Sequence, residues 1–167
     1  MSYPHSEIRK RLKFPQERRS VMFMGEYRHS LDAKGRLIIP AKFREQLGER
    51  FVVTRSLDHC LSIYDMASWE AFADRLEKIP SNAQKQREVV RFFLSSAAEL
   101  EPDKQGRALL PANLRELAGI KEDVVFLGCG KYCEIWSKEQ YEAHESSISQ
   151  EEISKIAEEM LSGGFTF

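Results

Sequence analysis

The chain has 167 residues with ordinary apolar and charged fractions, which excludes general disorder and suits one domain or two very small ones. A net charge of −1 and only three cysteines exclude a uniformly basic nucleic-acid binder and a disulfide-stabilised secreted domain. No segment is apolar enough for a membrane span or a secretory leader, so we expect a cytoplasmic protein with no membrane partner.

The charge is unevenly distributed along the chain. Residues 1–24 carry six Lys and Arg against two Glu, whereas residues 134–167 carry eight Glu against two Lys. The basic N-terminal segment and the acidic C-terminal segment therefore cancel in the net charge of the chain. The net charge consequently says little about the charge of any local surface patch. We expect residues 1–21 to form a basic N-terminal extension, either a disordered tail or an arm that grips DNA.

One segment of the sequence occurs twice. Residues 32–48 (DAKGRLIIPAKFREQLG) return 71 positions later as residues 103–119 (DKQGRALLPANLRELAG), and eight residues are identical. Weaker similarities follow in the same order and with nearly constant spacing. They relate FVVT at 51–54 to VVFL at 124–127, LSIY at 61–64 to CEIW at 133–136, and WE at 69–70 to YE at 141–142. The sequence therefore predicts two copies of one module.

Each copy is predicted to begin with a strand, a tight turn and a second strand. Asp32 and Asp103 start the turns, where an Asp side chain can accept hydrogen bonds from backbone N–H groups just downstream. Gly35 and Gly106 supply the positive φ that such a turn requires.

A short helix and a second hairpin complete each copy. The apolar runs 37–39 and 108–110 are typical of strands buried on both faces. Pro40 and Pro111 suit the first position of the helices that follow, and Gly48 and Gly119 are placed to end them.

The remaining segments are predicted to be helical. Apolar spacing indicates helices near 69–79 and 84–94, and a Ser149–Glu152 capping box begins a last helix that ends near 161. We therefore divide the sequence into an N-terminal extension (1–21), a first module (22–70), a helical inter-module segment (71–95), a second module (96–141), and a C-terminal helix and tail (142–167).

The repeated motif carries a family resemblance. Asp-x-x-Gly-Arg, three apolar residues and Pro resemble the AbrB-like swapped-hairpin module. Two copies of it, opened by MFMGEY at 22–27, closely resemble the MraZ family of bacterial regulators of the division and cell-wall gene cluster. The resemblance runs from about residue 22 to the C-terminus, and residues 1–21 depart from the family pattern.

The resemblance implies an α+β, mainly β fold, with two tandem AbrB-like swapped-hairpin modules plus inter-module and C-terminal helices. It implies interleaved hairpins in each module, a ring-like homo-oligomer, and a nucleoid-associated, sequence-specific regulator that binds short tandem promoter repeats in double-stranded DNA. It also implies no cofactor and no small-molecule substrate, and it assigns the DNA contacts to 32–36 and 103–107.

Basic residues at and near the hairpin tips are the candidate DNA-binding residues. These are Arg28, Lys34, Arg36, Lys104 and Arg107. A guanidinium at a tip can fork onto phosphates or guanine edges, and the alternative is an arginine paired with the Asp four residues earlier. We interpret Asp32 and Asp103 as residues that form the turns and orient the arginines.

The two copies differ in charge. Residues 27–48 carry five Lys and Arg against two Asp and Glu, whereas residues 98–119 carry three against four. Phosphate attraction is therefore expected to favour the first copy.

Two other functions were weighed against DNA binding. Cys60 with His59 or another histidine would suit a hydrolase, but neighbouring strand residues point to opposite faces, which places His59 badly for activating the thiol. Cys129 and Cys133 lack the second ligand pair that a structural zinc site needs, so no catalytic or metal residue is assigned. The other alternative is a ring-forming scaffold protein without DNA binding.

Overall fold

The computed structural model describes residues 20–167, so the predictions for residues 1–19 lie outside the described part of the chain. The first copy contains β1 (Glu26–Ser30), β2 (Arg36–Ile38), α1 (Ala41–Leu47), β3 (Phe51–Arg55), β4 (Leu61–Asp65), α2 (Met66–Glu77) and α3 (Gln84–Leu94). The second contains β5 (Ala98–Leu100), β6 (Arg107–Leu109), α4 (Ala112–Leu117), β7 (Asp123–Gly128), β8 (Cys133–Ser137), α5 (Lys138–Ser147) and α6 (Gln150–Ser162). The same order of elements occurs twice, as the repeat predicts.

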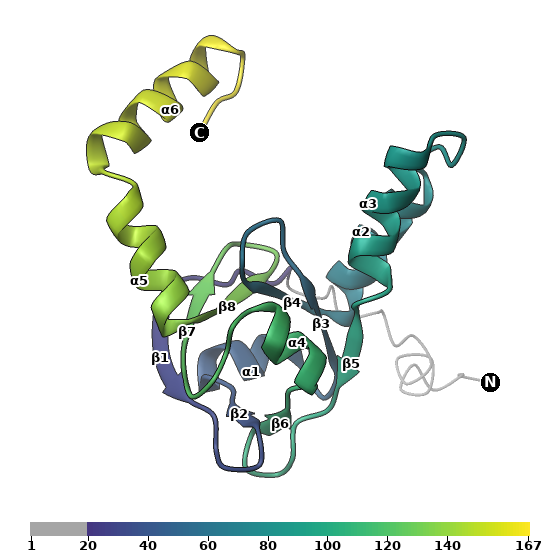
Figure 1. The fold of residues 1–167 in the computed structure, drawn as a ribbon, viewed down its shortest axis with the longest axis vertical. Coiled ribbons are helices and arrows are strands. Elements are labelled where there is room, and N and C mark those ends of the chain that lie inside the picture. Colours follow the sequence, from purple (N-terminus) through teal and green to yellow (C-terminus); the bar gives the residue numbers. More distant parts are fainter. Residues whose placement is uncertain (1–19) are drawn as a thin grey trace, which may run out of the picture.

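The two copies interleave in one antiparallel sheet. Its strand order is β1-β7-β8-β4-β3-β5, and β2 pairs with β6 in a separate two-stranded ribbon. β1 corresponds to β5, β7 to β3 and β8 to β4. Replacing each strand by its counterpart in the other copy therefore gives the same order, read from the opposite edge of the sheet. Each copy thus supplies its first strand to the other: Tyr27 pairs with Phe126, and Phe51 pairs with Leu100. The predicted α+β fold with two modules is confirmed, but the expected interleaving within each module is wrong, because the strands of the two copies interleave with each other (Figure 1).

A single core holds both copies together. Phe43 of α1 meets Phe23, Tyr27 and Phe126 edge-on, with ring centroids 5.4, 5.0 and 6.4 Å apart. Leu114 of α4 lies in the same buried cluster. Burying such large side chains provides most of the stabilisation, and neither copy can bury them alone.

The β2–β6 ribbon departs from expectation in one respect. Leu37 and Ala108 are each only 1% exposed, but Ile38 is 45% and Leu109 59% exposed. The prediction that these runs are buried on both faces is therefore wrong. The ribbon lies at one end of the molecule with the core on one side only, so alternate side chains point outward.

Helical arms extend from the sheet in two directions (Figure 1). Phe72 of α2 stacks on Tyr64 and meets Phe93 of α3 edge-on, which fixes the first arm to β4. In the second arm, α6 begins at the predicted capping box: Ser149 Oγ accepts from the Glu152 N–H, and the Glu152 carboxylate accepts from the Ser149 N–H. None of the described helices is long and apolar enough to cross a membrane.

Candidate nucleic-acid interface

Each tight turn is built around one aspartate. Asp32 Oδ1 accepts hydrogen bonds from the backbone N–H groups of Lys34 (2.9 Å) and Arg36 (3.0 Å), and Oδ2 accepts from Arg36 Nε at 2.6 Å. Asp103 repeats this arrangement with the N–H of Gln105 (2.9 Å), and with the N–H (3.0 Å) and Nε (2.8 Å) of Arg107. The Asp residues therefore form the turns and orient the arginines, as expected from the sequence.

The clamp stabilises the charged form of each aspartate. The backbone N–H of Arg36, assisted by its guanidinium and by the N–H of Lys34, holds the pKa of Asp32 below its usual value. The equivalent groups of Arg107 and Gln105 lower the pKa of Asp103. Within each guanidinium, only Nε donates a hydrogen bond to the aspartate. Among residues 20–167, neither guanidinium makes another hydrogen bond. The terminal amino groups of both arginines are therefore without a hydrogen-bond partner among the described residues, and such groups can donate to phosphate oxygens or a guanine edge.

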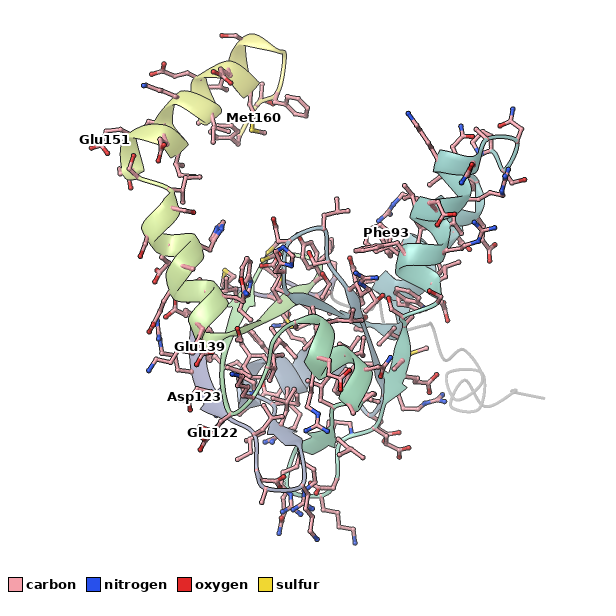
Figure 2. All side chains as sticks on the ribbon, viewed as in Figure 1. Phe93, Glu122, Asp123, Glu139, Glu151 and Met160 are labelled. Carbon is pink, nitrogen blue, oxygen red and sulfur yellow. The ribbon has the colours of Figure 1, made fainter. Side chains whose placement is uncertain are left out.

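The ribbon brings both clamps to one surface. Arg36 pairs across the ribbon with Leu109, and Ile38 pairs with Arg107. Both arginines consequently lie on the outward face, next to the turns that carry Lys34 and Lys104. We call this surface, made of the two turns and the outward face of β2 and β6, the ribbon end. Nitrogen-tipped side chains gather there in Figure 2.

Arg28 lies on another surface. Its guanidinium contacts Glu26 (3.3 Å) and Glu142 (3.8 Å) and lies over the Tyr141 ring, 5.7 Å from the centroid. These contacts turn it toward Tyr141 and Glu142 of α5, and about half of the side chain stays exposed. The structure therefore unites four of the five predicted residues and leaves Arg28 apart from them.

Two further arginines reach the turns, and the sequence did not single them out. A Cβ on Gly106 would lie 1.6 Å from Nη1 of Arg44, and a Cβ on Gly35 would lie 2.8 Å from Nη1 of Arg115. The short helix of each copy thus packs an arginine against the turn of the other copy. Both arginines occupy the same position in the repeat, and that recurrence was the only signal for them.

We expect Gly106→Ala to weaken DNA binding beyond its effect on stability. Gly106 (φ +76°) and Gly119 (φ +64°) both adopt left-handed backbone, so Ala at either position costs about 1–2 kcal/mol in strain. Only at Gly106 does the new methyl group displace Arg44, because nothing lies within 4 Å at Gly119. Thermal denaturation and a DNA titration of the two variants check this, and equal DNA affinities would contradict it.

The cysteines do not form a nucleophilic site. Cys60 is 4% exposed, and burial raises its pKa to about 12, which keeps the thiol protonated. A protonated thiol is a poor nucleophile. Burial also raises the pKa of Cys129, to about 11, and that of Cys133.

The model of a family described as "MraZ protein, putative antitoxin-like" matches twice, over residues 22–92 and 93–163. The chain belongs to the MraZ family. The family resemblance of the sequence is thereby confirmed, and each family match spans one copy of the repeat.

Individual relatives agree with this assignment. The chain is 49% identical over 141 residues to a protein of Thermoanaerobacter sp. (strain X514), which covers 83% of this chain and 99% of the relative. It is 47% identical over 146 residues to a protein of Lachnoclostridium phytofermentans, covering 87% and 100% respectively. A Desulfitobacterium hafniense protein is 48% identical over 143 residues, covering 86% and 99%. All three are named transcriptional regulator MraZ, so this MraZ chain is a transcription regulator and not an enzyme.

Proposed function

We propose that the chain regulates transcription by binding double-stranded DNA through the ribbon end. The observation that carries the proposal is the pair of Asp–Arg clamps, Asp32–Arg36 and Asp103–Arg107, fixed side by side on one exposed ribbon. Lys34 and Lys104 on the adjoining turns, with Arg44 and Arg115 behind them, add charge that attracts phosphates. A two-stranded ribbon also has dimensions that fit the major groove.

The finer proposal follows the family resemblance. The targets are short tandem repeats in the promoter of the division and cell-wall gene cluster, read by a ring-shaped homo-oligomer at the nucleoid in the cytoplasm. Arg28 is left out of the proposed interface, because Glu26, Glu142 and Tyr141 already engage it.

The test is a gel-shift titration of the pure protein on the DNA upstream of its own gene, at several salt concentrations. Binding that weakens steeply with salt, and that exceeds binding to scrambled DNA of equal length, is expected. A ring-forming scaffold without DNA binding would show no salt-dependent affinity for either fragment.

We expect the protein to be a stable homo-oligomer. Ile153, Ile156, Met160 and Leu161 form an apolar stripe along α6, and each is at least 40% exposed. Figure 2 places Met160 on this side of the helix and Glu151 on the opposite side. A stripe of this kind requires a partner surface, which a second copy of the chain can supply.

Light scattering at micromolar concentration should therefore give a multiple of the 19.3 kDa chain mass. The double variant Ile156→Asp, Met160→Asp should lower that mass, because burying two charges against an apolar surface is unfavourable. Lys155→Asp on the polar side of α6 is the matched control and should leave the mass unchanged. A monomeric wild-type protein would contradict the prediction.

A further inference from the structure

Two aliphatic side chains stand uncovered in the middle of the ribbon end. Ile38 is 45% and Leu109 59% exposed, whereas the next residues along the chain, Ile39 and Leu110, are at most 1% exposed. They occupy the same position in the two copies, one on each strand of the ribbon. The interleaving of the copies thus places two outward-facing aliphatic groups on one small surface.

The surroundings of these side chains indicate what covers them. Leu109 lies directly across the ribbon from Arg36, and Ile38 lies across from Arg107, so aliphatic and guanidinium groups alternate around the face. The adjoining turns add Lys34 and Lys104. Although Asp32 and Asp103 pair with the two arginines, Lys34 and Lys104 leave a net positive charge around the aliphatic patch. Such a surface complements a polyanion that also carries apolar groups, and it fits an uncharged protein surface poorly.

Duplex DNA offers such groups at one place. In the major groove, thymine alone among the bases presents a methyl group, and apolar side chains contact it there. Ile38 and Leu109 lie on the same face of the ribbon as Arg36 and Arg107. If the ribbon enters the groove until the arginines reach base edges or phosphates, the two aliphatic side chains reach the same depth.

We propose that Ile38 and Leu109 recognise thymine through its C5-methyl group when the ribbon end binds DNA. This inference rests on the proposed DNA binding and adds the base preference of the site. The ribbon is antiparallel, with Leu37 opposite Ala108 at its centre, so a local two-fold axis relates Ile38 to Leu109. The two side chains accordingly approach thymines on opposite strands of the duplex.

The experiment compares two probes of identical sequence, the fragment upstream of the gene prepared either with thymidine or with deoxyuridine, which lacks only the methyl group. Transfer energies of a buried methyl or methylene predict about a fourfold weaker binding per lost contact, and so roughly 15-fold for two. The double variant Ile38→Ser, Leu109→Ser should bind both probes equally, with about the affinity of the wild-type protein for the deoxyuridine probe. Leu57→Ser, at a residue 83% exposed on the β3–β4 turn, is the matched control and should keep the wild-type preference.

The outcomes separate this inference from the proposal on which it rests. A wild-type protein that binds both probes equally tightly overturns the thymine contact and leaves DNA binding intact. A wild-type protein that binds neither probe overturns both. A double variant that keeps the probe preference but has a lower mass by light scattering would assign the two side chains to a subunit contact, which also overturns the inference. The comparison of wild-type affinities stands even if the double variant folds poorly.

Discussion

DNA with three tandem binding sites should bind the oligomer roughly 10²–10⁴ times more tightly than DNA with one site. One ribbon end offers two outward arginines, and a good bidentate base contact provides roughly 1–3 kcal/mol of discrimination. Specific sites usually exceed non-specific DNA by about 4–10 kcal/mol. The two arginines of a single subunit therefore provide roughly 2–6 kcal/mol, which reaches at most the lower part of that range.

A closed oligomer supplies the difference by repetition. Once the first ribbon end is bound, its neighbour meets the next site at a high effective concentration, provided that the site spacing matches the subunit spacing. Titration of probes with one, two and three sites measures the gain. The control is a three-site probe with half a helical turn inserted between sites, which faces successive sites in opposite directions. Equal binding of the one-site and three-site probes, or indifference to the insertion, would disprove the model.

We also expect Arg36→Ala and Arg107→Ala to weaken DNA binding, with the larger loss for Arg36→Ala. Loss of a base contact costs about 1–3 kcal/mol and relaxes specificity, and loss of a phosphate contact lowers the log–log salt slope by about one. The cross-packing of Arg44 and Arg115 gives each turn one additional cation. Glu99 on β5 is paired with Arg50 at 2.9 Å, but Glu101, between β5 and the second turn, replaces the Ser30 of the first copy, so we still expect phosphates to be attracted more strongly to the first turn.

Arg28→Ala is the matched control for these variants, because it removes an arginine of β1 that contacts α5 and lies outside the ribbon end. Its DNA affinity should stay near that of the wild-type protein. Equal losses for Arg36→Ala and Arg107→Ala would remove the case for a dominant first copy, and a comparable loss for Arg28→Ala would extend the interface to β1.

The tight turns and the helix cap were predictable from the sequence, because each is determined by a few neighbouring residues and the turn residues recur in both copies. Asp and Gly at fixed positions predicted the turns, and the observed φ values of Gly35 and Gly106 are +77° and +76°. The capping box at Ser149 likewise depends on neighbouring residues alone. Such features are determined by a few consecutive side chains, so a single sequence contains the information for them.

Features that depend on distant pairing were not predictable. A run of three apolar residues does not reveal whether a strand is covered on one face or both, and so Ile38 and Leu109 were misassigned. Arg44 approaches Gly106 only because the two copies interleave. Counting the charges within one copy cannot reveal a contact between residues of different copies. The ribbon itself joins β2 to β6, two strands that belong to different copies.

The strand order also dictates when this protein can fold during synthesis. β1 is among the first structured elements to leave the ribosome, yet its hydrogen-bonding partner is β7, near the opposite end of the chain. At translation rates of roughly 5–20 residues per second, β1 waits several seconds with an unpaired edge. Pairing between such distant segments slows folding. The native fold of each subunit therefore depends on β1 pairing with β7 of its own chain before it meets the unpaired β7 of a neighbouring chain.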